Sequence, residues 1–430
     1  MFKILINAWK VKDIRKKMLF IAFILLVFRI GNHIPLPGVD MQMLDMIRHG
    51  TPETRSLFSL IAGGGYGSLF AMGISPYITS SIVMQLLTVA IPKLEQIQKE
   101  GEEGRKKINQ ITRIVAVGLS LLQASATVYS YIHLRDGANL FGTHGYLLVY
   151  VIATLAMVTG TIFIMWMGEV LTEKGIGNGS SFIIFANILS SLPGGIMSMI
   201  ALMTQAPALL LGIVKFLLAI LVFGGVIAFT VLIQDGERRI PVQYSKKLVG
   251  KQMYGGQSSF IPIKVNVAGV MSIIFASSLL QFPDQLAGFF QGNQTLANIA
   301  AFLDIGKNNI TLSGVSLYMI LIFVFTFFYT SFAINTTEMA ENMKKNGGFI
   351  PGIRPGRPTS DFVKRTVDRL SFFGAFFYCL IALIPILFQR FAGLSHLGGT
   401  SLLIVVGVAL EFIKQLESQL LMRHYKGFLS

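Results

Sequence analysis

Ten runs of roughly twenty predominantly apolar residues follow one another along this 430-residue chain. A run of about 20 apolar residues is long enough to cross a bilayer as an α-helix. Within lipid, backbone groups find hydrogen-bond partners only inside helices or closed barrels, and the period-two alternation of a membrane barrel is absent. We therefore expect an all-α polytopic membrane protein with ten transmembrane helices. The predicted spans are residues 18–36, 69–91, 114–134, 146–168, 181–203, 209–233, 265–282, 312–334, 370–388 and 397–413.

Positive charge indicates which side of the membrane each loop occupies. The segments on the same side as the N-terminus hold 29 of the 36 Lys and Arg residues, whereas the loops on the opposite side hold 5. Lys and Arg are enriched in cytoplasmic loops, so both termini are predicted to be cytoplasmic. The formal net charge of +15 is therefore concentrated on one side of the membrane.

The spans divide the chain into two halves. Five spans in each half would give two pseudo-symmetric halves of opposite orientation, as in membrane proteins built from inverted repeats. Ahead of them, residues 1–17 are basic and carry Phe2, Leu5 and Trp9 at helical spacing, which predicts an interfacial helix on an anionic lipid leaflet. The predicted parts are this interfacial helix, an N-terminal half (18–205), a C-terminal half (206–413) and a cytoplasmic tail (414–430).

The stretch between residues 56 and 92 departs from a simple bundle of spans. Residues 57–62 are apolar but form only about two helical turns, too few to cross a bilayer. A broken half-segment beside a full span usually lines a cavity. The alternative is that small residues here only allow helices to pack closely. The glycines that break the helix are Gly63, Gly64, Gly65 and Gly67.

Two rows of side chains mark the span that follows. Residues four apart stack on one side of a helix, and here one such row is aliphatic and the other is polar. A glutamine facing lipid would leave its donors and acceptors unpaired, so the polar row should face protein, water or a partner segment. The aliphatic row is Ile74, Ile78 and Ile82, and the polar row is Ser81, Gln85 and Thr88.

Two long cytoplasmic loops, residues 234–264 and 335–369, are rich in Arg and Lys. In the first loop, the alternation over residues 239–245 predicts a β-strand, which could be one arm of a hairpin. In the second, the Pro and Gly residues between 349 and 358 predict a stiff, non-helical projection with Arg354 and Arg357 at its tip. Docking of a cytoplasmic partner accounts for two shaped projections better than charge anchoring to the membrane does.

A glycine run, residues 175–179, precedes the fifth span but lacks the Lys-Ser/Thr ending of a phosphate-binding loop. We interpret it as a tight turn into a helix. Pro193 and its neighbouring Ser and Gly residues then predict an interruption of the fifth span. This would be a second irregular helix in the N-terminal half.

Several kinds of functional site are missing from the sequence. The single cysteine, Cys379, excludes an internal disulfide, and with six scattered histidines we expect no metal and no other cofactor. No Asp or Glu lies in the middle of a predicted span, and no Walker A motif or catalytic constellation is present. What remains is a cavity of isoleucines and small polar groups, which suits a chemically varied cargo such as a polypeptide. A secondary solute transporter built from inverted repeats is the alternative.

Six motifs, in order along essentially the whole chain, resemble those of the bacterial SecY family, the pore subunits of protein-conducting translocation channels. The resemblance implies two five-span halves that part between spans 2–3 and 7–8, a lateral gate into the bilayer. The motifs are RIGNHIPLPG (29–38), GISPYITSSI (73–82), GIGNG (175–179), NVAG (266–269), FIPGIRPG (349–356) and GTSLLI (399–404).

The resemblance also implies roles for particular residues. A ring of aliphatic side chains would close the pore: Ile74, Ile78, Ile184, Ile274 and Ile404. The remaining ring position falls on Ser180, where many members have an aliphatic residue. A plug, about residues 57–67, would block the outer funnel with Leu57, Phe58, Leu60, Ile61, Gly63, Gly64, Gly65 and Tyr66. The lateral gate would carry the polar cluster Gln85, Gln123 and Asn266, and the partner-docking surface would carry Arg238, Arg239 and Arg354.

Partners and location follow from the same resemblance. It implies the membrane subunits SecE and SecG, the SecA motor ATPase, the ribosome and polypeptides that bear signal sequences. The implied location is the bacterial plasma membrane, where unfolded secretory polypeptides pass across and membrane segments leave sideways into the lipid. A ring of isoleucines sheds water when no chain is threaded through it, so it could close a wide channel without an ion-binding site.

Overall fold

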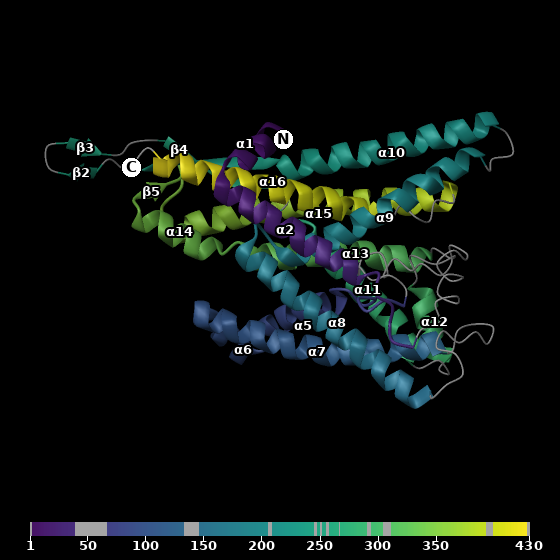
Figure 1. Ribbon diagram of the computed structural model, residues 1–430. Helices are drawn as coiled ribbons and strands as arrows, with labels where there is room; N and C mark the ends of the chain where they lie inside the picture. Colours follow the sequence, from purple (N-terminus) through teal and green to yellow (C-terminus); the bar gives the residue numbers. More distant parts are fainter. Residues whose placement is uncertain are drawn as a thin grey trace.

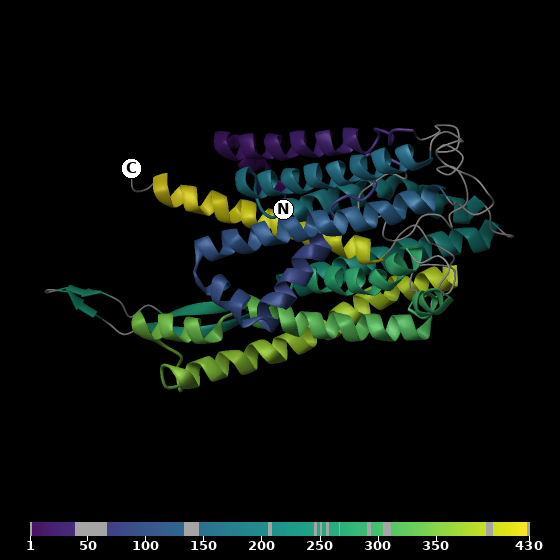
Figure 2. The same cartoon turned by 90° about the horizontal axis from the view of Figure 1, so that it is seen from below.

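The computed structural model describes residues 2–38, 67–132, 146–204, 209–244, 247–249, 252–254, 258–265, 267–289, 294–303, 311–392 and 399–427. These residues form an elongated bundle whose long helices run roughly along one common axis (Figure 1 and Figure 2). The strands gather at one end of the bundle (Figure 1).

The described helices and strands follow the chain in this order. In the N-terminal half the helices are α1 (Phe2–Lys10), α2 (Lys12–Gly31), α5 (Ser75–Ala90), α6 (Pro92–Lys99), α7 (Glu102–Ile132), α8 (Tyr146–Lys174) and α9 (Gly179–Thr204). In the C-terminal half they are α10 (Leu209–Asp235), α11 (Met271–Phe289), α12 (Gln294–Phe302), α13 (Leu312–Ala333), α14 (Thr336–Lys345), α15 (Arg357–Ala392) and α16 (Gly399–Gly427). The strands are β1 (Glu237–Tyr244), β2 (Lys247–Val249), β3 (Gln252–Tyr254), β4 (Ser258–Lys264) and β5 (Gly348–Phe349).

Each of the ten predicted spans overlaps one of these helices, which confirms the predicted helical membrane fold. Among the described residues, five helices are by themselves long and apolar enough to cross a bilayer, and six are if α5 and α6 count as one bent span. Helix α5 alone has only 16 residues.

The second span ends in a sharp elbow. Helix α5 stops at Ala90, and Pro92 opens α6 at an angle of 101° to it. Proline has no amide hydrogen to donate, so it suits the first turn of a new helix but not the interior of an existing one. Helix α6 then crosses α7 closely at Gly104, where an added Cβ would overlap the carbonyl oxygen of Ile97.

The glycine run forms the predicted tight turn between α8 and α9. Gly177 has a φ of +93°, a conformation that glycine adopts without steric cost. The amide of Gly179 donates to Thr172 Oγ1 (2.9 Å), and the amide of Ser180 donates to Asn178 Oδ1 (3.0 Å). These two hydrogen bonds satisfy amides at the start of α9 that have no partner within the helix.

The predicted interruption of the fifth span is wrong. Helix α9 continues through Pro193 to Thr204. A proline inside a helix removes one backbone hydrogen bond, and α9 accommodates this loss without ending.

Both ends of the chain differ in detail from the predicted boundaries. Helix α1 ends at Lys10 and α2 begins at Lys12, so residues 12–17 belong to the first spanning helix. At the other end, α16 runs on to Gly427, so most of the predicted tail is helical. Helix α1 packs against both α2 and α16, which brings the first and the last helix of the chain into contact.

The two basic loops meet in one sheet. Strand β1 pairs antiparallel with β4, in register from Glu237–Lys264 to Gln243–Ser258, which confirms the predicted strand and its place in a hairpin. Strand β5, from the second loop, pairs with the other edge of β1. Side chains of this sheet form a buried cluster with α14 and α15. The two loops therefore share one platform, formed by β1, β4 and β5, and strands β2 and β3 of the first loop form a separate two-stranded sheet beyond it (Figure 1).

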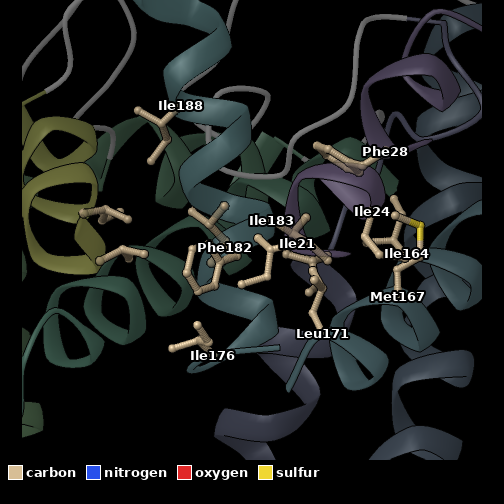
Figure 3. Packing of buried hydrophobic residues seen from close by; sticks show 14 of the residues in the cluster. Ile21, Ile24, Phe28, Ile164, Met167, Leu171, Ile176, Phe182, Ile183 and Ile188 are labelled. Carbon is tan, nitrogen blue, oxygen red and sulfur yellow. The ribbon is translucent and has the colours of Figure 1, made fainter. Parts of the chain in front are cut away.

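Two larger buried clusters hold the spans together. The first, here called the N-terminal core, joins α2, α8 and α9 and includes Phe28, Ile164 and Ile183 (Figure 3). The second, the C-terminal core, joins α10, α11, α13 and α15 and includes Ile273 and Ile322. Side chains from α11 and α16 enter the N-terminal core, and one from α5 enters the C-terminal core.

Candidate functional site

The start of α5 is fixed by the segment that follows α2. The amide of Leu36 donates to the carbonyl of Gly67 (2.9 Å), and the amide of Leu69 donates to the carbonyl of Ile34 (2.8 Å). Residues 29–38, which carry one of the sequence motifs, thereby hold the backbone that leads into α5.

Aromatic and glycine contacts secure the same segment from two helices. The ring of Phe70 stacks on Phe28 of α2, with centroids 6.1 Å apart, and lies 6.0 Å from Phe163 of α8. An added Cβ on Gly31 of α2 would overlap the ring of Phe70. An added Cβ on Gly160 of α8 would overlap the carbonyl oxygen of Leu69, the residue before Phe70. These two glycines allow α2 and α8 to pack closely against residues 69–70, and this packing positions the first turn of α5.

The predicted ring residues come together at the junction of the two halves. Ile74, Ile184, Ile274 and Ile404 are each at most 3% exposed and belong to the N-terminal core. Ile78 is partly buried and packs against both cores. Ile74 caps the start of α5, and the other four lie within the first six residues of α5, α9, α11 and α16. Their closeness is a structural finding, and their role as a seal stays a prediction.

A cavity of about 390 Å³, here called the vestibule, is lined by three of these isoleucines. Along α16 its lining extends from Ile404 to Ser418, roughly 21 Å at the helical rise, and becomes polar from Glu411 onward. The vestibule therefore has a polar wall that leads to an aliphatic end. Its other polar lining residues include Asn178, Ser181, Gln234, Lys414 and Gln415.

Ser180 lies beside the ring at the α8 side. Its Oγ is 3.5 Å, and Ile74 Cδ1 is 3.4 Å, from the position that a Cβ would take on Gly168. The residue that lines the vestibule on this turn of α9 is Ser181. The side chains of Ser180 and Ile74 thus both lie against Gly168 of α8, and a place for Ser180 in the ring stays a prediction.

The helices on both sides of the predicted lateral gate are in contact. Helix α5 packs against α7, where the Ser80 hydroxyl donates to the carbonyl of Thr112 (2.6 Å), and α11 contacts both α5 and α7. Gln123 on α7 is buried, and the Oε1 atom of Gln85 on α5 is buried without a hydrogen-bond partner among the described residues. The third predicted gate residue, Asn266, lies outside the described residues, as do the plug residues Leu57, Phe58, Leu60, Ile61, Gly63, Gly64, Gly65 and Tyr66.

The three predicted docking arginines are exposed, two of them on β1 of the platform and Arg354 just after β5. Arg239 forms an ion pair with Glu237 (2.6 Å), and its guanidinium lies 4.7 Å from the centroid of the Phe260 ring. Arg238 is its neighbour on β1. Arg354 lies between β5 and α15, where its carbonyl oxygen accepts a hydrogen bond from the Thr359 hydroxyl (2.9 Å).

Known proteins are similar to this chain along its whole length. The sequence profile of the SecY family matches residues 68–413. A protein translocase subunit SecY from Halalkalibacterium halodurans is 42% identical, and one from Bacillus subtilis is 41% identical. Both alignments cover 100% of this chain and 100% of the relative. The chain belongs to the SecY family.

Solved structures of SecY-family and related channels have the same fold. The structure described as a protein conducting channel superposes with a TM-score of 0.64 at 18% identity and covers 93% of this chain and 90% of its own. Sec61 in a canine ribosome–channel complex gives a TM-score of 0.63 at 17% identity, with the same coverage. At these identities the likeness supports the fold alone.

Sequence reasoning missed one polar contact of this SecY-family chain. Lys414 Nζ lies 2.7 Å from Asp235 Oδ1 and donates to the carbonyl of Gln234 (3.1 Å). A lysine at this position donates a hydrogen bond to a carbonyl at the end of α10. Its positive charge is also stabilised by the negative end of the α10 helix dipole. Because the partners are separated by 180 residues in the chain, no local pattern could reveal the contact.

Proposed function

We propose that this SecY-family chain is the pore-forming subunit of a protein translocation channel. It passes unfolded secretory polypeptides across the bacterial plasma membrane and releases apolar segments sideways into the lipid. The observation that carries the proposal is the vestibule, whose polar wall leads to isoleucines contributed by α9, α11 and α16. These helices come from both halves, so a movement of one half against the other changes the width of the closure.

An aliphatic closure suits a channel for polypeptides. Hydrophobic constrictions close by dewetting, because water leaves a narrow apolar passage when nothing occupies it. Isoleucine side chains carry no fixed charge or hydrogen-bonding group, so they favour no particular side chain of the passing polypeptide. They can also rotate aside and close around a chain of varying width.

Sideways release needs a seam that opens toward lipid. The seam between α5 and α7 on one side and α11 on the other joins the two halves. Parting it would expose the ring to the bilayer, so an apolar segment could move from the pore into lipid without crossing a polar surface.

The cytoplasmic platform is proposed as the docking surface for the SecA motor and the ribosome, with Arg238, Arg239 and Arg354 as contacts. Long exposed arginines attract acidic surfaces and the phosphates of RNA. Because the sequence has no Walker A motif, energy is expected to come from such partners. Small membrane subunits of the SecE and SecG kind complete the proposed channel.

Both termini are proposed to be cytoplasmic, and α1 is proposed to lie on anionic lipid. Ile6 and Trp9 on α1 are 58% and 48% exposed, whereas Ala8 on the same helix is fully buried. An apolar face that is not covered by protein, next to basic residues, is typical of interfacial helices.

A secondary solute transporter is the second candidate function and is less well supported. Ion-coupled transporters usually bind their ions with carboxylates or broken helices near the bilayer midplane. No Asp or Glu lies in the middle of a span here, and the ionisable residues of the vestibule lie toward its cytoplasmic end.

Reconstituted transport would separate the two functions. The chain, assembled with SecE and SecG in vesicles, is given SecA, ATP and a secretory protein. We expect the secretory protein to become protected from protease only when it carries its signal sequence. Absence of protection, together with signal-independent uptake of small solutes, would favour the transporter instead.

A further inference from the structure

Helix α12 lies at the end of the bundle opposite the platform, and its axis crosses the direction of the long helices (Figure 1). It packs against α11, and its nine residues include no charged side chain. The spans leave the hydrocarbon at the ends of the bundle, so a helix that crosses one end lies near the boundary between lipid and water.

The exposed surface of α12 has an apolar and a polar side. Ile299 and Phe302, which are three residues apart and share one face, are 45% and 62% exposed. Gln294 and Asn298, which are four residues apart, are exposed on the adjoining face. Leu296, on the side opposite this polar face, is half-buried. A surface that changes from buried to exposed apolar to polar around a helix is typical of helices that lie in the membrane interface.

The end of α12 adjoins the lipid-facing side of α13. The carbonyl oxygen of Phe302 accepts hydrogen bonds from the hydroxyls of Thr311 (2.9 Å) and Ser313 (2.7 Å), which hold α12 beside the first turn of α13. Between these two residues, Leu312 is exposed and begins an exposed row along α13 that includes Ile320. In a membrane-spanning helix such an apolar row faces lipid, so lipid also reaches the end of α12.

We propose that α12 is an interfacial anchor, whose Ile299 and Phe302 side chains insert among the lipids of the leaflet opposite the platform. Under the proposed orientation this is the outer leaflet. Lipid is the partner that fits this face, because the face is continuous with the lipid-facing row of α13. Since α12 carries no charge, the contact depends on apolar area and not on anionic lipid, in contrast to the proposed contact of the basic helix α1.

The anchor holds two spans at a fixed level. Helix α12 packs against α11 and is hydrogen-bonded to the start of α13, so its position in the interface sets the depth of both helices in the bilayer. An interfacial helix places its apolar face about 5–10 Å into the boundary between headgroups and acyl chains. This role is independent of what the channel transports.

Tryptophan fluorescence in vesicles tests the anchor. The chain has two tryptophans, Trp9 and Trp166, and replacing both by Phe gives a background for single-tryptophan variants. Ile299→Trp reports from the apolar face of α12, Asn298→Trp is the matched control on the polar face, and Ile320→Trp reports from the lipid-facing row of α13. The full chain is reconstituted with phospholipids that are brominated either near the headgroup or near the end of the acyl chain, and aqueous iodide is supplied on both sides of the membrane.

Each position should respond to a different quencher. We expect Ile299→Trp to lose most of its emission to bromine near the headgroup and little to iodide, and Asn298→Trp to show the reverse. Ile320→Trp should respond most to bromine near the chain end, because it lies roughly 12 Å further along α13 than Leu312. The same pattern is expected in vesicles without anionic lipid. If Ile299→Trp does not fold, Phe302→Trp, a conservative change on the same face, carries the test.

Three results would overturn the anchor. Iodide quenching of the apolar-face variant equal to that of Asn298→Trp would show that this face lies in water. A lack of response to both iodide and brominated lipid would show that protein covers it. A response to brominated lipid only when anionic lipid is present would contradict the apolar basis of the contact. Absence of lipid quenching in Ile320→Trp would instead contradict the membrane-spanning fold, whatever the behaviour of α12.

Discussion

Replacing one ring isoleucine by asparagine tests whether the buried isoleucines close the pore. Ile404 on α16 is 1% exposed and borders the vestibule. In Ile404→Asn an amide of similar length would stand where an aliphatic side chain excludes water. We expect the closure to become wet, so that ions leak and weak signal sequences are accepted.

The magnitude follows from the burial of Ile404. Burying an Ile side chain contributes about 1.5–3 kcal/mol, and an amide left without partners in an apolar site costs about 1–3 kcal/mol. Together these terms disfavour the closed, dry state by about 2.5–6 kcal/mol. The lower end already corresponds to a roughly 70-fold larger ratio of open or wet channels to closed ones.

Single-channel conductance in planar bilayers measures this fraction directly. Ile183→Asn is the matched control, because Ile183 is fully buried in the same core but is not among the residues that line the vestibule. The control should reduce the amount of folded protein without making the remaining channels leak. Wild-type conductance and signal stringency in Ile404→Asn, or an equal leak in Ile183→Asn, would refute the reasoning.

Two further predictions concern the platform and the α8–α9 turn. Arg354→Glu should strongly reduce SecA-driven transport into vesicles while leaving the unfolding temperature unchanged, because the side chain is exposed; undiminished transport would contradict the docking role. Gly179→Ala should lower the free energy of unfolding by about 1–3 kcal/mol, because its Cβ would collide with the carbonyl oxygen of Gly168. Gly224→Ala meets open space and should not destabilise the protein, so equal melting of the two variants in detergent would count against the packing argument.

The spans, the platform strand and the α8–α9 turn could be predicted because each depends on local sequence. Apolar length identifies a helix in lipid, alternation identifies β1, and a glycine run identifies a turn. The continuation of α16 to Gly427 could not be seen in this way, because hydropathy reports the part of a helix inside lipid and not its extension into water. Helix α9 likewise continues through Pro193, since the surrounding bundle supports a helix that local propensity would end.

The candidate site was only partly predictable for a related reason. The row of Ile74, Ile78 and Ile82 is visible as a four-residue spacing, but the spacing does not say which core each side chain enters. That assignment depends on how α5 lies against α11 and α13, which no local pattern specifies. The contact of Lys414 with the end of α10 has the same origin. The plug residues and Asn266 remain predictions, as do the roles of the ring and the docking arginines.

Crosslinking of an arrested secretory chain tests the central claim most directly. With Cys379 replaced, single cysteines are placed at Ile78 on α5, at Ile274 on α11 and, as a lipid-facing control, at Leu217 on α10, which is 59% exposed. If the polypeptide passes through the isoleucine closure, it should crosslink to both Ile78 and Ile274 positions and not to Leu217. No crosslink at the two ring positions, or an equal yield at Leu217, would contradict a pore at this place in the molecule.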